Sequence, residues 1–116
     1  MKHHNKIRNF GRPTDQRRAL LKSLAVSLVR DEKISTTEAK AKELRPFLER
    51  LVTKAKEDTL AARRLLISRL SSEVAAAKLI TLAKRYETRA GGYLRITKLH
   101  VRAGNDARRE AMIEFV

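Results

Sequence analysis

Several residue types and patterns are scarce in this sequence, and each absence excludes a class of protein. None of the 116 residues is cysteine, which excludes a disulfide framework, a thiol nucleophile and a cysteine-ligated zinc site. No uninterrupted apolar run approaches the 18 or so residues needed to cross a bilayer, so we expect no membrane span. Aromatic residues make up only 4% of the chain, which leaves few rings for stacking bases and argues against an aromatic-platform RNA module or a sequence-tolerant single-strand binder.

Sequence patterns that carry catalysis are missing as well. Neither of the glycine-rich phosphate-binding patterns, G-x-x-x-x-G-K-[ST] and G-x-G-x-x-G, occurs. His3 and His4 are far from His100 in sequence, and no carboxylate pattern beside them has metal-ligand spacing. Most acidic residues stand beside Lys or Arg on predicted helices, where solvated ion pairs explain them. We therefore predict a protein that is not an enzyme and has no catalytic residue, metal, cofactor or small-molecule substrate.

Positive charge, by contrast, is in large excess. The chain has 27 Lys and Arg residues against 13 Asp and Glu residues, a net charge of +14. The excess is densest in residues 1–22 and 85–109, whereas residues 23–84 carry mixed charge. Mixed charge is typical of a solvated helical surface, and charge of a single sign is typical of a surface that binds a polyanion. We expect nucleic acid as the partner, bound through dispersed Arg and Lys side chains that contact its backbone and shape.

The N-terminal half of the chain alternates between basic, helical and extended patterns. Residues 1–13 have no countable period, and we interpret them as a basic arm that precedes a single α+β domain over residues 14–116. Apolar spacing predicts a helix capped by Thr14 and running to about Arg30. A short strand is predicted over Lys33–Thr36 and then a second helix capped by Thr37. This helix contains Pro46, which is expected to kink or divide it.

Two shorter helices and a hairpin are predicted in the second half. Asp58 or Thr59 is expected to cap a helix ending near Leu70, and Ser71 or Ser72 the next one, whose apolar stripe reaches Tyr86. Arg63, Arg64 and Arg69 are expected to face water or a partner. Strand-forming residues then cover Tyr93–Arg102, with a bulge or a change of buried face suggested near Thr97. Turn residues at 103–107 and a final strand over Ala111–Phe115 complete an antiparallel hairpin, with Ile34–Thr36 as a candidate third strand.

Three segments of the sequence stand out together: Ile34–Lys42 continuing through Glu49–Lys56, then Arg89–Lys98, and the ending Ala111–Val116. These segments resemble the ribosomal protein L17 family of the bacterial large subunit. Lys2, His3 and Arg17 also fit the basic opening of that family. The resemblance implies an α+β fold of four helices packed on a small three-stranded mixed sheet. It further implies cytoplasmic ribosomes as the location, large-subunit ribosomal RNA and neighbouring ribosomal proteins as partners, and a place on the solvent side near the nascent-chain exit region.

The resemblance also indicates which basic residues face the RNA. Arginine can fork two phosphate oxygens, and lysine acts as a point charge. The charge distribution adds Lys22, near the start of the first helix, and Arg102. Gly91 and Gly92 either stop a helix or let the backbone approach RNA closely. The positions carried over from the family are Lys2, His3, Lys6, Arg8, Arg12, Arg17, Arg18, Lys40, Lys42, Arg89, Arg95 and Lys98.

Two other functions are compatible with the charge alone. A DNA-compacting or regulatory protein would also need a cationic surface. Competition between structured ribosomal RNA and duplex DNA for binding distinguishes this hypothesis from a ribosomal protein. A basic amphipathic protein on anionic membranes is the third alternative. Its helical stripes would be expected to carry Trp, which this chain lacks.

Overall fold

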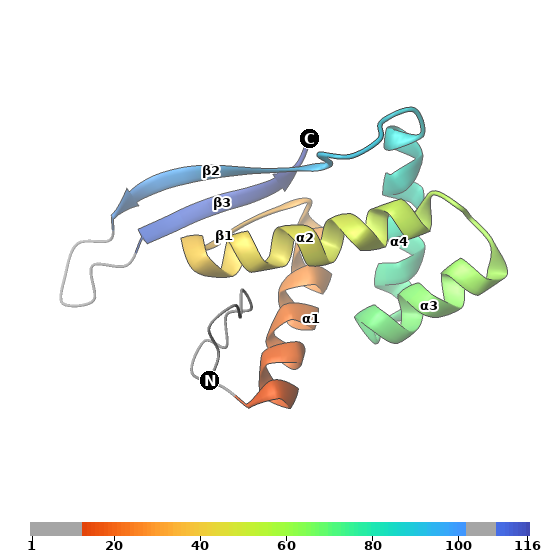
Figure 1. The fold of residues 1–116 in the computed structure, drawn as a ribbon, viewed down its shortest axis with the longest axis horizontal. Coiled ribbons are helices and arrows are strands. Elements are labelled where there is room, and N and C mark those ends of the chain that lie inside the picture. The colour runs from red at the N-terminus through yellow and green to blue at the C-terminus, as the bar shows by residue number, and fades with distance from the viewer. Residues whose placement is uncertain (1–12, 102–108) are drawn as a thin grey trace, which may run out of the picture.

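The fold is seen in a computed structural model that describes residues 13–101 and 109–116 (Figure 1). The predicted α+β class is confirmed. The arm residues 1–12 and the predicted turn at 103–107 lie outside the described residues. In the described part the elements are α1 Thr14–Asp31, β1 Lys33–Thr37, α2 Glu38–Ala55, α3 Leu60–Leu70, α4 Glu73–Ala83, a 3-10 helix η1 Lys84–Tyr86, β2 Leu94–Val101 and β3 Arg109–Phe115.

The sheet is antiparallel throughout, so the expectation of a mixed sheet is wrong. Its strand order is β1-β3-β2, and β3 pairs antiparallel with both neighbours. The hairpin brings β3 back along β2, and β1 then pairs with the free edge of β3 rather than with β2. Although β1 and β2 run in the same direction, β3 separates them. No parallel ladder therefore forms between the described strands.

The register across the sheet explains where the core lies. Ile34 of β1 and Ile96 of β2 both stand opposite Ile113 of β3. Ile113 is fully buried, whereas its two neighbours are partly buried. The pairing of β2 with β3 shifts between Lys98 and Val101, which confirms the irregularity expected near Thr97.

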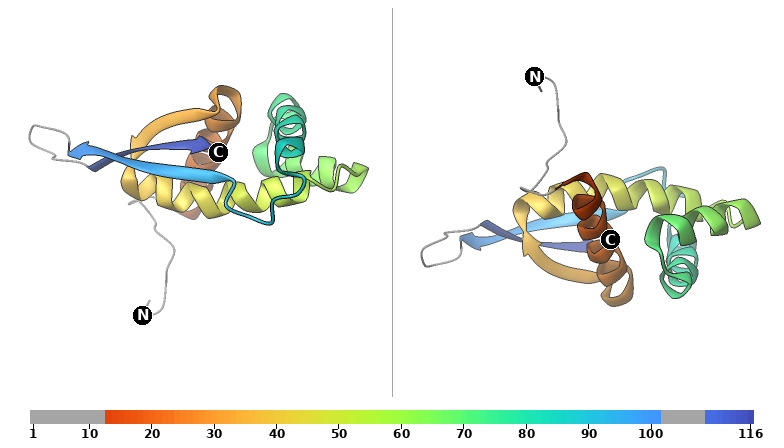
Figure 2. Two further views of the ribbon diagram at one scale, coloured as in Figure 1. Left: turned by 90° about the horizontal axis from the view of Figure 1, so that it is seen from above. Right: turned by 90° about the horizontal axis from the view of Figure 1, so that it is seen from below.

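The helices form two groups, and only one of them covers the sheet. Helix α2 lies along one face of the sheet and contacts all three strands, and α1 contacts β1 and α2 (Figure 2). The main contacts of α3 and α4 are with each other and with α1 and α2. The expectation that all four helices pack on the sheet is therefore wrong. Helix α2 is central because its apolar residues Leu44, Leu48 and Val52 are fully buried between these layers.

Three helix starts follow the predicted capping chemistry. The side chains of Thr37, Thr59 and Ser72 accept hydrogen bonds from backbone N–H groups three residues further on, at 3.3, 3.1 and 3.1 Å. These bonds satisfy donors that the first helical turn leaves unpaired. The alternatives Asp58 and Ser71 instead take left-handed backbone angles, with φ of 49° and 53°.

One prediction about a helix start and one of two alternatives about a helix interior are wrong. Thr14 does not cap α1, because Pro13 occupies the N-cap position and no side chain caps the helix. Helix α2 continues through Pro46 as one element, so the alternative that Pro46 divides it is wrong. Within the described ranges, no helix combines the length and the hydropathy that a membrane span requires.

Candidate nucleic-acid interface

Four cationic side chains surround an open hollow where α1, α2 and α3 meet. We call it the basic hollow. Its volume is about 220 Å³. None of its described lining residues is a carboxylate, so the charge that they carry is of one sign. The lining residues are Arg17, Arg18, Leu21 and Lys22 of α1, Phe47 of α2 and Arg69 of α3.

Arg17 is the cation in this hollow whose hydrogen bonding is incomplete. Among the described residues, its Nε is the only buried side-chain nitrogen or oxygen without a hydrogen-bond partner. A buried donor left unpaired costs about 1–3 kcal/mol. A guanidinium binds phosphate through charge-assisted bonds, and a turn of the Arg17 side chain that brought Nε to a phosphate oxygen would remove that cost.

Lys22 is held in place at the edge of the same hollow. Its Nζ donates a hydrogen bond to the Ser71 Oγ at 3.0 Å. Ser71 ends α3 with a left-handed backbone angle, so this bond ties α1 to the turn between α3 and α4. An ammonium group has three donors, and the bond to Ser71 uses one of them.

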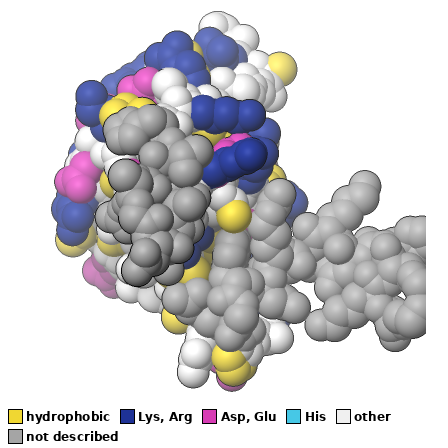
Figure 3. Space-filling model, turned by 90° about the vertical axis from the view of Figure 1, so that its left-hand side faces the viewer, with side chains coloured by type: hydrophobic (Ala, Val, Ile, Leu, Met, Phe, Trp, Pro, Cys, Tyr) yellow, Lys and Arg dark blue, Asp and Glu magenta, His cyan; other side chains and the backbone are white. Residues whose placement is uncertain are grey.

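A second cationic group lies at the end of the sheet nearest the start of α2. The Lys42 Nζ is 2.9 Å from the Glu38 Oε1, and the Lys98 Nζ is 3.7 Å from the same oxygen. The hydrogen bond from Lys42, followed by the charges of Lys42, Lys98 and Arg109, lowers the pKa of Glu38. One carboxylate therefore faces three cations, and the group keeps a net positive charge. Figure 3 shows Lys and Arg side chains over the upper part of this end of the molecule, with Asp and Glu side chains among them.

Arg95 belongs to β2 but has a cross-strand partner. Its guanidinium Nη2 is 3.4 Å from the Glu114 Oε1, and the two residues stand opposite each other in the register of β2 and β3. The Arg95 side chain is 60% exposed. An exposed pair of this kind contributes about 0–1 kcal/mol. Glu114 therefore orients the guanidinium but leaves it accessible to a partner.

The segment before β2 is held by a compact hydrogen-bond network. The Arg89 carbonyl accepts from the Lys56 Nζ at 2.6 Å and from the Tyr93 hydroxyl at 3.1 Å. The Arg89 Nε donates to the Gly91 carbonyl at 3.1 Å, and Gly92 has a φ of +67°. The hydrogen bond from Lys56, followed by that from Thr53, lowers the pKa of Tyr93. The positive φ favours glycine at position 92, and the Arg89 side chain is partly engaged by its own loop.

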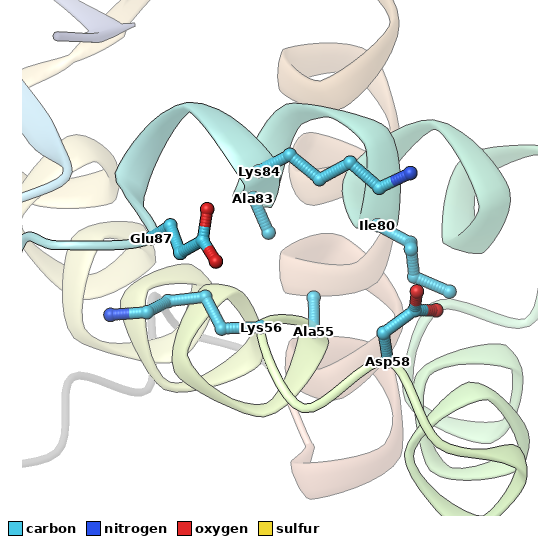
Figure 4. A pocket seen from close by; sticks show the side chains of 7 residues that line it. All are labelled: Ala55, Lys56, Asp58, Ile80, Ala83, Lys84 and Glu87. Carbon is cyan, nitrogen blue, oxygen red and sulfur yellow. The ribbon is translucent and has the colours of Figure 1, made fainter.

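A different hollow, between the end of α2 and α4 with η1, lacks this single-sign character. Figure 4 shows two lysines and two carboxylates around an apolar floor. Because these charges balance, the hollow offers a polyanion no net attraction. Its lining residues are Ala55, Lys56, Asp58, Ile80, Ala83, Lys84 and Glu87.

Comparison with known proteins identifies the family. The family model described as ribosomal protein L17 matches residues 20–116. The chain is 51% identical to the large ribosomal subunit protein bL17 of Hydrogenobaculum sp. (strain Y04AAS1), over 100% of this chain and 99% of that protein. The chain belongs to the ribosomal protein L17 family. It is also 51% identical to bL17 of Anaplasma marginale (strain Florida), over 100% of this chain and 90% of that protein, and 48% identical to bL17 of Neorickettsia sennetsu (strain ATCC VR-367 / Miyayama), over 100% of both. Membership confirms the resemblance and makes the chain a ribosomal protein rather than an enzyme.

Those predicted RNA-facing residues that the structure describes do not form one cluster. Arg17, Arg18 and Lys22 meet in the basic hollow. Lys42 and Lys98 meet at Glu38, whereas Arg89 and Arg95 have separate local partners. Lys40 is partly buried near the start of α2, where its backbone N–H donates to Thr37. Lys2, His3, Lys6, Arg8, Arg12 and Arg102 lie outside the described residues.

Sequence reasoning missed two members of the basic hollow of this L17 protein. Arg69 is predicted only to face water or a partner, and Phe47 only to adjoin the apolar stripe of the second helix. The distance in sequence between α1, α2 and α3 explains both omissions, because no local pattern links them. The signal that was available is Phe47 itself, a ring at a partly buried position beside the apolar stripe of α2.

Proposed function

We propose that this chain is a structural constituent of the large ribosomal subunit that binds large-subunit ribosomal RNA through backbone and shape contacts. As an L17 family member, it is a large-subunit protein of ribosomes in the cytoplasm. In this proposal it supports assembly and architecture of the subunit near the exit-tunnel side. Neighbouring ribosomal proteins are its other partners.

The basic hollow is the observation that supports RNA binding best. Within residues 13–101 and 109–116, four cations and no carboxylate line it, and the Arg17 Nε there is buried without a hydrogen-bond partner. Phosphate contacts position a protein on nucleic acid and dominate its affinity. Arg17, Arg18 and Arg69 can each fork two phosphate oxygens, whereas Lys22 supplies a point charge.

The proposal divides the chain into an arm and a domain. Residues 1–13 act as a basic arm that adds phosphate contacts to those of an α+β domain over residues 14–116. Support comes from the charge of the arm, which has no acidic residue. Deleting residues 1–12 should weaken RNA association while the helical circular dichroism signal persists. Loss of that signal would make the arm part of the fold instead.

Salt dependence tests RNA binding by the whole chain. If roughly 6–10 phosphates are contacted, affinity for large-subunit ribosomal RNA should fall by about 10³–10⁵ between 50 and 200 mM salt. Filter binding across this range measures the slope. An affinity that did not change with salt concentration would contradict the proposal. Equal affinity for duplex DNA in competition would favour a DNA-binding function.

Charge-neutralising variants test the basic hollow within this proposal. Arg17→Gln and Arg69→Gln should each weaken binding and reduce the salt slope by about 1. Arg63→Gln is the matched control, since Arg63 is exposed on α3 and does not line the hollow. If all three variants behaved alike, binding would depend on net charge rather than on this surface.

The position in the subunit can be mapped because the chain has no native cysteine. A single introduced cysteine, Ala77→Cys on the exposed side of α4, can carry a tethered iron chelate. After assembly into subunits, hydroxyl radicals should cleave ribosomal RNA that borders the exit region. Cleavage confined to RNA remote from that region would contradict the proposed location.

A further inference from the structure

We propose that the basic hollow receives one unpaired nucleotide of the RNA, with its base against Phe47 and Leu21 and its phosphate on the arginines. This inference rests on the proposed function and specifies what that surface recognises. The basic hollow would then recognise a local feature of RNA structure, in a protein otherwise expected to contact the RNA backbone.

Phe47 is the ring that makes this inference specific. Among the aromatic residues that the structure describes, Tyr86, Tyr93 and Phe115 are buried, with exposed fractions of 3%, 1% and 7%. Phe47 is the remaining one and is only partly buried. It lines the hollow that carries four cations and no carboxylate. An accessible ring beside arginines is the combination on which unstacked bases bind.

The size and walls of the hollow fit one base rather than a larger ligand. Its volume of about 220 Å³ lies below the roughly 300–1,000 Å³ of pockets that hold drug-sized molecules. Leu21 and Phe47 give it an apolar side, which a phosphate alone would not need. Bases inside an A-form helix are stacked and cannot enter, so the nucleotide must be bulged or in a loop.

The arginines supply the other half of the site. The Arg17 Nε is buried and lacks a partner among the described residues, and a turn of its side chain toward the inserted nucleotide would let a phosphate oxygen accept from it. Lys22 is held at the rim by its bond to Ser71. The hollow therefore places cationic hydrogen-bond donors beside an apolar surface that suits a planar ring. A nucleotide has a phosphate for the donors and a base for the apolar surface.

Affinity measurements with two matched RNA hairpins test the inference. The hairpins share one sequence, but one has a single bulged uridine. The full chain should prefer the bulged hairpin, and Phe47→Leu should lower its affinity for that hairpin about tenfold, within the range of base–aromatic stacking. Phe47→Tyr keeps a ring and should retain the preference. Val74→Ala is the control, since Val74 is 82% exposed and does not line the hollow.

A crosslinking measurement reports the contact directly and does not depend on affinity. A 5-iodouridine placed at the bulge should crosslink to Phe47 on irradiation, and mass spectrometry of the RNA-linked peptide identifies the residue. Circular dichroism melting of each variant confirms that it is folded.

Specific outcomes overturn the inference. Equal affinity of the native chain for both hairpins would do so, as would an equal loss on both hairpins in Phe47→Leu, or a crosslink elsewhere. In these cases the proposed function still stands if the chain binds large-subunit ribosomal RNA with the expected salt dependence. Failure to bind that RNA at all would instead contradict the proposed function.

Discussion

Glu38 shows at the scale of one residue how a single carboxylate organises a cationic surface. Among the described residues it is the one charged residue that the fold buries, with 8% of the residue exposed. Lys42 of its own helix and Lys98 of β2 both approach its Oε1. The ion pair between Glu38 and Lys98 thus links α2 to the hairpin, and Glu38 holds two predicted RNA-facing lysines, Lys42 and Lys98, in position.

Replacing Glu38 by Gln should make stability depend less on pH. The pKa of Glu38 is lowered in the folded chain by Lys42, Lys98 and Arg109. Its stabilising effect is therefore present above the ordinary carboxyl pKa of about 4.3 and is lost as pH falls through the lower folded value. Urea unfolding should show the native chain more stable than Glu38→Gln at pH 7, with the gap closing toward pH 3. A gap that stayed constant over this range would contradict the ionic origin.

Gly92 and Gly91 offer a matched pair for backbone conformation. Gly92 has a φ of +67°, and the nearest atom to an added Cβ would be 3.9 Å away, so space is not limiting. Gly92→Ala should cost about 1–2 kcal/mol of unfolding free energy, because a side chain disfavours this left-handed region. Gly91→Ala meets nothing within 4 Å and should be neutral or slightly stabilising. Equal effects in chemical denaturation would show that the φ of Gly92 is not the cause.

At the scale of elements, a hydroxyl residue at a helix start stabilises the helix only where its side chain caps the first turn. Thr59→Ala should lower the free energy of unfolding by about 1 kcal/mol, because the Thr59 hydroxyl caps α3. Thr14→Ala removes the same hydroxyl next to an N-cap that makes no side-chain bond and should change stability by less than about 0.5 kcal/mol. Thermal or urea unfolding compares the two. A larger loss in Thr14→Ala would contradict the assignment of Pro13 as the N-cap.

The continuity of α2 shows tertiary contacts overriding a local signal. Pro46 removes a backbone donor from the helix interior, which disfavours an isolated helix by roughly 3 kcal/mol. Leu44, Leu48 and Val52 are fully buried around it, and each such side chain contributes about 1.5–3 kcal/mol of burial. Burial therefore exceeds the local cost, and the helix continues through an exposed Pro46.

At the scale of the whole molecule, the net charge of +14 should make the free protein respond to salt in the opposite sense to its RNA complex. Like charges repel in the compact state, and added salt screens that repulsion. The melting temperature of the free chain should therefore rise between 20 and 200 mM sodium chloride, while affinity for RNA falls. Differential scanning fluorimetry measures the first effect. A melting temperature that fell with salt would contradict self-repulsion as the dominant whole-molecule term.

The elements themselves were largely determined by the sequence. Apolar residues three and four positions apart, hydroxyl residues at Thr37, Thr59 and Ser72, and the alternation of Ala111, Ile113 and Phe115 all act between near neighbours. Such signals need no partner from a distant segment. The excess of positive charge and the family resemblance were likewise present in the linear chain.

Only the tertiary structure decided how these elements meet. Placing β3 between β1 and β2 made the sheet antiparallel, and packing α3 against α1 and α2 brought Arg69 and Phe47 beside Arg17. Both results depend on contacts between segments far apart in the chain. No local periodicity encodes such contacts, because they are selected by the burial of complementary faces in the assembled core.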